Sequence, residues 1–355
     1  MNCPVKLTQA NDASIAARHQ PALVLGYARS RDAPGAPLLR GTGLDSVDDG
    51  LDEHLLSATQ YLQLLANVAR SLASSDTRFM LGQQLLPGHY GAVSHALLQA
   101  QNLRQALSVL CGSHTRLCPL LQPRLRDAGA FQVLYWTDAF GAPSQLPFLV
   151  EMHMTALSAM CRWLAGEPLP WRYCFNRARP RHVEQHEVHL GQDLRFDCQL
   201  DAMLIDTAWL DRPWPRGNAT AAAMAQRAAS LEAAPAPSLL GGLYDYLLRE
   251  LRRAPTLERT AQDFGVSPAT LKRHLARHGS HFQAELDQVR AHKAIYLFQA
   301  HGYDNDAVAA YLGFHDATNF RRSFKRWTGQ TPQLLRHTSR RSGHARSLTA
   351  NPTTK

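Results

Sequence analysis

Apolar residues in the first part of the chain recur at helical spacing before they change to the alternation of strands. Leucine and valine return every three or four residues from Leu51 to Ser74 and from Tyr90 to Cys111, which predicts two amphipathic helices. Shorter helical segments are predicted at residues 12–20, with an extension to 27, at 36–41 and at 79–86. The chain therefore opens with helices.

A small sheet is predicted next. Residues 120–125 and 131–137 alternate on either side of a turn at 127–129, which predicts a β-hairpin. An apolar helix at 146–163, a strand at 171–176, a helix at 180–190 and short strands at 194–197 and 202–205 around a turn follow. Helices followed by an antiparallel sheet with interleaved helices predict an α+β domain that ends near Leu210.

Proline and glycine between Arg212 and Gly217 interrupt this pattern, and the alanine-rich residues 219–238 predict a helix or part-helical linker. A helix at 239–253 then opens an all-α domain. The last residues are rich in Ser, Arg, Thr and Gly and predict a disordered basic tail. The predicted parts are an α+β domain (1–211), a linker (212–238), an all-α domain (239–340) and the tail (341–355).

Two helix–turn–helix units are predicted in the second domain, joined by one helix at 282–299 that would be about 27 Å long. In the first unit Thr256 caps one helix, Gly265 forms the tight turn, and Ser267 caps the next helix. Pro268 fits the first turn of that helix because its missing N–H has no partner there. Leu271 and Leu275 face the core of this unit, and the outward positions are Ala269, Lys272, Arg273 and Ala276.

The second unit has the same plan, and its caps and turn are Asp304 or Asn305, Gly313 and Asp316. Its last helix carries Phe320, Phe324 and Trp327 at positions i, i+4 and i+7, which places them on one side. The remaining surface is polar or cationic, with Thr318, Asn319, Arg321, Arg322, Lys325 and Arg326. A row of cations with few acidic neighbours is typical of a helix that lies against phosphates.

The net charge of +9 supports this interpretation because it is unevenly distributed over the 355 residues. Residues 1–238 hold 20 Lys/Arg and 20 Asp/Glu, whereas residues 239–355 hold 18 and 9, so the whole excess lies in the last third. Such asymmetry favours nucleic acid or an anionic membrane as the partner. A membrane helix would carry one long apolar stripe. The short helical units here favour nucleic acid.

The run 257–336 resembles the DNA-binding domain of the AraC/XylS family of bacterial transcription regulators. The resemblance rests on four stretches: Val266–Arg273, Gly279–Phe282, Val289-Arg290, and Gly313-Phe314 through Gly329–Pro332. It departs from the family's usual pattern at Thr260, in place of an aliphatic residue, and at Ala307. The resemblance implies that Ala269, Lys272 and Arg273 face one DNA groove, and that Thr318, Asn319 and Arg322 face the next. Arg321 is a further candidate for DNA contact.

Arg322 is the strongest candidate for a base contact because a guanidinium can grip a guanine edge with two hydrogen bonds. Lys325 and Arg326 are expected to hold phosphates, together with the N-terminal amides of the helices. Major-groove faces recur roughly every 34 Å along DNA. A rigid helix of about 27 Å could hold the two units in successive groove turns on one face of the duplex.

The first 210 residues resemble the effector domain of the ornithine-utilisation-regulator type within the same family. The matching stretches are Gly82–Pro87, Gly88–Gly91, the helix after Asn102-Leu103, and Leu194–Asp197 before Ala202–Ile205. The resemblance implies a regulator, expected to be an activator, that binds double-stranded promoter DNA and recruits RNA polymerase. A small organic effector, an amino acid or a carboxylate, would bind the first domain, which is also a candidate homodimer surface. No effector-binding residues are predicted.

Other chemistry is weakly supported by the sequence. His182, His186 and His189 form an HxxxHxxH pattern that could hold a metal, but the surrounding arginines and glutamates favour a solvated polar helix face. Five aromatic residues could line an effector pocket, although core packing is the simpler interpretation: Tyr135, Trp136, Trp163, Trp171 and Tyr173. No metal and no cofactor are predicted.

An enzymatic first domain is the main alternative, and an architectural DNA-binding protein is another. A Pro-Cys-His-Arg nucleophile, a phosphate loop, GxSxG and HExxH are all absent from the sequence, which argues against an enzyme. A neutral domain of about 210 residues is larger than an architectural role requires.

The six cysteines lack metal-site spacing and are expected to be buried free thiols in a reducing cytoplasm. No signal peptide is expected. Residues 79–103 lack Asp, Glu, Lys and Arg, but their glutamines, histidines and proline argue against a membrane span.

Overall fold

The computed structural model describes residues 7–46, 51, 53–232 and 235–333. The chain divides into two compact units, one of residues 1–242 with 273–279, the other of residues 243–272 with 280–355. The first unit is α+β and the second is all helical, as predicted. The tail predicted at 341–355 and the end of the all-α domain, 334–340, lie outside the described residues.

The first unit opens with a two-stranded antiparallel sheet of β1 (Ile15–Ala16) and β2 (Leu55–Leu56). The helix predicted at 12–20 is therefore wrong. Instead α1 (Gln20–Arg29) begins where Pro21 fits the first helical turn. Three helices follow: α2 (Gly35–Leu39), α3 (Ala58–Leu72) and α4 (Thr77–Leu85). The helix predicted from Leu51 begins only after β2, at a capping box formed by Ser57 and Gln60.

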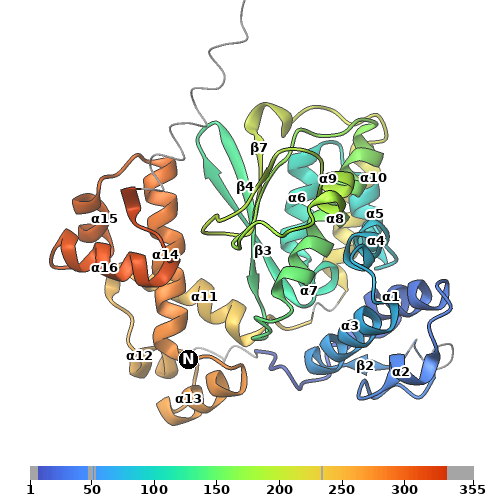
Figure 1. Cartoon of the computed structure of the whole chain (residues 1–355), viewed down its shortest axis with the longest axis horizontal. Helices are drawn as coiled ribbons and strands as arrows, with labels where there is room; N and C mark the ends of the chain where they lie inside the picture. Colours follow the sequence, from blue (N-terminus) through green and yellow to red (C-terminus); the bar gives the residue numbers. More distant parts are fainter. Residues whose placement is uncertain (1–6, 47–50, 52, 233–234, 334–355) are drawn as a thin grey trace, which may run out of the picture. The chain divides into compact units, whose positions relative to one another are not determined.

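The single helix predicted from Tyr90 to Cys111 is two helices, α5 (Ala92–Leu98) and α6 (Leu103–Gly112). The break occurs because the Asn102 side chain accepts a hydrogen bond from the backbone N–H of Gln105 and so starts a new helix. The short α7 (His114–Leu117) follows, and α6 and α7 pack against the strand that comes next (Figure 1).

The main sheet has the strand order β3-β4-β7-β5-β6. Its strands are β3 (Leu121–Ala128), β4 (Phe131–Asp138), β5 (Arg172–Cys174), β6 (Leu194–Arg195) and β7 (Ala202–Asp206). The predicted hairpin of β3 and β4 is confirmed. However, β5 lies between β6 and β7 and pairs with β6 in parallel, so the all-antiparallel sheet is wrong. The helix α9 (Glu184–Leu190) connects β5 to β6, as a parallel pair requires.

The core of the first unit is centred on α8 (Leu146–Ala165), in which most side chains from Leu149 to Leu164 are buried. It packs against α4. A 3-10 turn at Thr207–Trp209 precedes α10 (Ala219–Leu231), which packs against α5 with Ala222 fully buried. The residues predicted to be a linker thus include a helix that contacts this unit.

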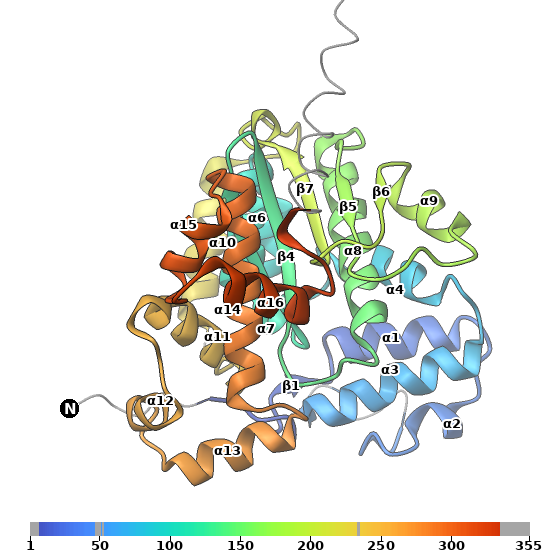
Figure 2. The same cartoon turned by 60° about the vertical axis from the view of Figure 1, so that its left-hand side comes forward.

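The second unit contains the tandem helices (Figure 2). They are α11 (Leu239–Glu250), whose first turn belongs to the first unit, a 3-10 turn (Leu251–Arg253), α12 (Leu257–Asp263), α13 (Pro268–Arg277), whose second half from residue 273 also belongs to the first unit, α14 (Phe282–Ala300), α15 (Asn305–Tyr311) and α16 (Ala317–Thr328). In the part of the chain that the structure describes, no helix combines the length and the apolar character needed to cross a bilayer.

Candidate nucleic-acid interface

The first helix–turn–helix unit is formed by α12 and α13, and its caps are those predicted. The Thr256 hydroxyl accepts a hydrogen bond from the backbone N–H of Arg259 at 3.3 Å. Gly265 turns the chain with φ of +70°, a conformation that an L side chain rarely adopts. The Ser267 hydroxyl then accepts from the N–H of Thr270 at 3.1 Å and starts α13.

The outward side of α13 is the side that was predicted. Leu271 and Leu275 are fully buried. Ala269, Lys272 and Arg273 are exposed. One side of the helix is therefore held by packing, while two cations and a methyl group remain available to a partner.

The second unit repeats this construction in α15 and α16. Asp304 accepts from the N–H of Ala307 at 2.8 Å, and Gly313 turns the chain with φ of +75°. Asp316 caps α16, where one carboxylate oxygen accepts from the backbone N–H of Asn319 at 2.7 Å and the other from its side-chain amide at 2.8 Å. The amide of Asn319 is thus engaged by its own cap.

Aromatic packing fixes α16 on α14. Phe320 and Phe324 are fully buried, and their rings lie 6.0 and 5.7 Å from that of Phe298. Trp327 is half-buried and lies 5.8 Å from the ring of Phe314. Burial of two phenylalanines contributes several kcal/mol, which is enough to hold the opposite side of α16 toward solvent.

All six residues predicted on the outward side of α16 are exposed, but they are not equally available. The guanidinium of Arg321 folds back on its own helix and donates to the Ala317 carbonyl at 3.3 Å and to the Thr318 hydroxyl at 3.1 Å. Arg326 pairs with Asp287 of α14, with 3.2 Å between Nη2 and Oδ2. Among the described residues, Arg322 and Lys325 have no such partner.

Asp287 was not singled out from the sequence, and its neighbour Arg290 was named only within the stretch Val289-Arg290 that carries the family resemblance. Arg290 lies 4.0 Å from Asp287 and 5.7 Å from the centre of the Phe314 ring. Burial lowers the pKa of Arg290, and the charge of Asp287 opposes this. The two residues are three positions apart on α14, which places them on one side of the helix. For Asp287, that spacing was the only signal in the sequence.

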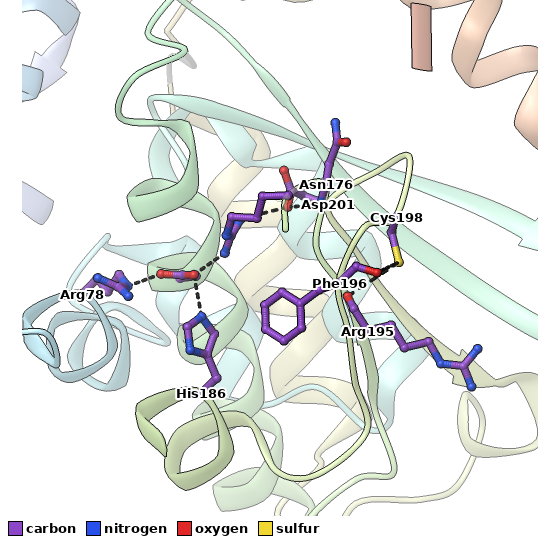
Figure 3. Close-up of polar contacts among 9 residues, drawn as sticks. Arg78, Asn176, His186, Arg195, Phe196, Cys198 and Asp201 are labelled. Carbon is purple, nitrogen blue, oxygen red and sulfur yellow. Dashed lines mark hydrogen bonds and ion pairs between the residues drawn. The ribbon is translucent and has the colours of Figure 1, made fainter. Parts of the chain in front are cut away.

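A second group of polar side chains lies in the first unit (Figure 3). We call it the Glu151 cluster, and its members are Arg78, Glu151, Arg177, His186 and Asp201. Glu151 is buried on α8 and pairs with the guanidinium groups of Arg78 and Arg177. Its carboxylate also lies 2.7 Å from Nε2 of His186, and Arg177 reaches Asp201 at 3.2 Å.

The ionisation of the two carboxylates is set by opposing effects. Burial raises the pKa of Glu151, but the hydrogen bond with His186 and the charges of Arg177 and Arg78 outweigh it, so the pKa is lowered overall. Burial raises the pKa of Asp201 in spite of the Asn176 backbone N–H and Arg177. Two guanidinium groups thus face two carboxyl groups, and the cluster is nearly self-compensating.

One histidine of the HxxxHxxH pattern, His186, belongs to this cluster. The predicted solvated position is wrong for that residue. His186 is buried against Glu151, and the rings of Phe79, Phe175 and Phe196 lie within 5.1–5.7 Å of it. His182 precedes α9 and is exposed, so it does not share a helical face with His186. Throughout residues 7–46, 51, 53–232 and 235–333, no three His, Cys, Asp or Glu side chains are grouped so that they could hold a metal ion.

The aromatic residues considered for a pocket are mostly core. Four of the five are buried, and only Trp163 is exposed. Tyr173 shares a 2.7 Å hydrogen bond with Ser158 of α8. A different cavity of about 510 Å³ lies beside α6 and is open to solvent. It is lined by Arg104, Leu107, Ser108, Cys111, Gly112, Leu125, Gln132 and Leu210.

Comparison with known proteins gives two family matches. Residues 33–214 match the arabinose-binding domain of AraC transcription regulators, and residues 260–338 match a helix-turn-helix domain. The ornithine utilization regulator of Pseudomonas aeruginosa is 28% identical over 88% of this chain and 93% of its own length. An uncharacterised helix-turn-helix regulator of Mycobacterium tuberculosis is 23% identical over 86% and 91%.

A solved structure, the transcriptional regulator CdpR of P. aeruginosa, covers 73% of this chain and 86% of its own, with 20% identity and a TM-score of 0.36. The matched families and relatives are transcription regulators and not enzymes.

Proposed function

Because this chain belongs to the AraC family of transcription regulators and carries a helix-turn-helix DNA-binding domain, we propose that it activates promoters in response to a small organic effector. In this proposal α13 and α16 are the recognition helices, which enter the major groove of double-stranded promoter DNA. The first unit holds the effector. The protein acts in the cytoplasm.

The observation that carries the DNA-binding proposal is the outward side of α16. Its inner side is held by Phe320 and Phe324, while Arg322 and Lys325 are exposed and, among the described residues, unpaired. We assign Arg322 to a guanine edge and Lys325 to a phosphate. Asn319 must leave its cap partner Asp316, and Thr318 must leave Arg321, before either can reach a base, so we rank both below Arg322.

The first recognition helix supplies the matching contacts in the proposal. Lys272 and Arg273 are exposed neighbours in the sequence, and between them they could contact one phosphate and one base edge. Ala269 offers a methyl group, which fits against the methyl group of thymine. The helix α14 has 19 residues and is about 28 Å long. This length supports the proposal that the recognition helices occupy successive major grooves, roughly 34 Å apart.

The test is selection of bound fragments from random DNA by wild type and by Arg322→Ala. We expect the variant to lose about 1–3 kcal/mol of binding free energy and to relax the preference at one position of the selected motif. Arg227→Ala is the matched control, since Arg227 is an exposed arginine on α10. An unchanged motif for Arg322→Ala would refute the assignment.

For the effector we propose an amino acid or a small carboxylate. The relative named for ornithine utilization matches this chain over nearly its whole length, which makes amino acids the first class to test. The cavity beside α6 is the candidate site, because its volume of about 510 Å³ suits a small molecule and Arg104, Ser108 and Gln132 offer polar groups. Arg104 is held there by Asp211, with both contacts at 2.7 Å.

A thermal-shift screen of amino acids and carboxylates tests this site. An effector should raise the melting temperature of wild type, and Ser108→Leu, which fills the cavity, should abolish the rise. Ser230→Leu, at an exposed serine of α10, is the control. A shift that persists in Ser108→Leu would place the effector elsewhere.

Two further parts of the proposal concern assembly. We propose that the protein binds as a homodimer and that it recruits RNA polymerase. Sedimentation with and without operator DNA tests the first part. Transcription in vitro with purified polymerase, with and without the effector, tests the second and separates activation from repression.

A further inference from the structure

Two cysteines of the first unit lie side by side although they are far apart in sequence. Cys174 ends β5, where its register partner in β6 is Arg195. Cys198 follows β6, and its backbone N–H donates to the Phe175 carbonyl at 3.0 Å. This bond brings the connection after β6 back against the end of β5. The two thiols lie in hydrogen-bonding contact.

Both cysteines of this pair are accessible to solvent. Cys118 and Cys161 are fully buried, whereas Cys174 and Cys198 are both partly exposed, as is Cys111. The sulfur of Cys198 lies 3.6 Å from the Arg195 carbonyl and 3.8 Å from the Phe196 carbonyl (Figure 3). A small oxidant can therefore reach a thiol that already has a second thiol beside it.

The two thiols are also chemically unequal. The hydrogen bond from Cys174 lowers the pKa of Cys198, helped by the Phe175 backbone and the charge of Arg195 and opposed by burial and by Asp201. The same hydrogen bond, together with burial, raises the pKa of Cys174. Since the thiolate is the nucleophile, Cys198 is the attacking residue and Cys174 the resolving one.

We propose that Cys174 and Cys198 form a redox modification site that reacts with hydrogen peroxide and closes to an intramolecular disulfide. In the first step the Cys198 thiolate attacks one peroxide oxygen, the O–O bond breaks, and hydroxide leaves and is protonated to water. Cys198 is then a sulfenic acid. In the second step the Cys174 sulfur attacks the Cys198 sulfur, the S–O bond breaks, and a second water leaves with the Cys174 proton. The two thiols lose two electrons, which reduce the peroxide.

The disulfide would join the end of β5 to the connection between β6 and β7, around the segment that contains α9. Asp201 and Arg177 of the Glu151 cluster lie beside the same two strand ends. A covalent link across this segment reduces the conformational entropy of the unfolded chain. The oxidised protein should therefore melt several degrees higher than the reduced protein.

Peptide mapping of the full chain after treatment with hydrogen peroxide tests the proposal. The oxidised protein should lose the mass of two hydrogen atoms. A non-reducing tryptic digest should contain one linked species of residues 173–177 and 196–216, which separates into two peptides on reduction. Cys111 and Cys118 provide an internal control, because burial raises the pKa of Cys111 to about 12 and that of Cys118 well above its usual range. They should remain thiols.

Two variants test the order of attack. In Cys174→Ser the sulfenic acid of Cys198 should persist and be trapped by a 1,3-dione. In Cys198→Ser position 174 should remain unlabelled. The proposal is overturned if wild type yields no linked species while Cys198 is oxidised to sulfinic acid, or if Cys111 and Cys118 link first. The wild-type digest decides this even if a variant does not fold.

Discussion

The two groups of charged side chains in this protein are organised in opposite ways. In the Glu151 cluster, each charge is buried or half-buried and has a partner of opposite sign. On α16, Arg322 and Lys325 are exposed and have no partner among the described residues, while Arg326 is held by Asp287. The difference teaches that charge alone does not mark a binding surface. A charge that the protein already pairs is less available to a ligand than one that it leaves uncompensated.

The largest effect is expected when the compensated cluster is broken. Glu151→Gln leaves two guanidinium groups and His186 around a neutral amide, and should cost about 3 kcal/mol of unfolding free energy, at the lower end of the range for such pairs because the arginines are partly exposed. Urea denaturation measures this. Glu184→Gln, at an exposed glutamate, is the control and should change little. A loss below about 1 kcal/mol of unfolding free energy for Glu151→Gln would show that the Glu151 cluster contributes little to stability.

The same contrast predicts a pH dependence of stability. The pKa of Glu151 is lower in the folded than in the unfolded protein, so its contribution is present above the unfolded pKa and is lost as pH falls through the folded pKa. Asp201 has a raised pKa and acts in the opposite sense. The difference in unfolding free energy between wild type and Glu151→Gln should therefore shrink below about pH 4.5. A constant difference from pH 7 to pH 3 would contradict this.

The uncompensated cations should appear in the salt dependence of DNA binding. Lys325→Ala should weaken binding to all sequences alike and reduce the slope of log K against log salt by about 0.9, because one phosphate contact is lost. Unfolding free energy should not change. Equilibrium binding at several salt concentrations measures the slope. If Arg326→Ala reduced the slope more than Lys325→Ala, the ranking of free over paired cations would be wrong.

The smallest effect is expected at the pair between α14 and α16. Arg326 is largely exposed, and the amide oxygen in Asp287→Asn can still accept from Gln283 and face Arg290, so the unfolding free energy should change by less than about 1 kcal/mol. DNA binding should become stronger, because the released Arg326 becomes available to a phosphate. The slope of log K against log salt should then become steeper. Direct comparison with Asp306→Asn, an exposed acidic residue of α15, controls for the lost negative charge.

The parts of the fold that were predicted correctly depend on signals close together in sequence. Each helix–turn–helix unit carries its glycine turn and its caps within a few residues, and Phe320 and Phe324 are one turn apart. In the first unit the decisive contacts are remote. Ile15 pairs with Leu56, and strands of two residues have no readable period. His186 reaches Glu151 across 35 positions, and a helical pattern of histidines gives no sign of that partner.

The candidate site residues follow the same division. The exposure of Ala269, Lys272, Arg273 and the α16 residues could be predicted from the spacing of their apolar neighbours. The partners of Arg321 and Arg326 could not, because they depend on side-chain rotamers and on Asp287 of another helix. Their roles at DNA remain predictions.

The caps of the two recognition helices have a consequence for the direction in which the protein lies on DNA. Ser267 presents a neutral hydroxyl at the start of α13, whereas Asp316 presents a carboxylate at the start of α16. A DNA phosphate is attracted by the amides at the first helix end and repelled by the carboxylate at the second. The N-terminal ends of α13 and α16 therefore differ in charge. If α13 and α16 read DNA as proposed, the sequence bound by one protein chain is asymmetric, and inverting that sequence should not give the same complex.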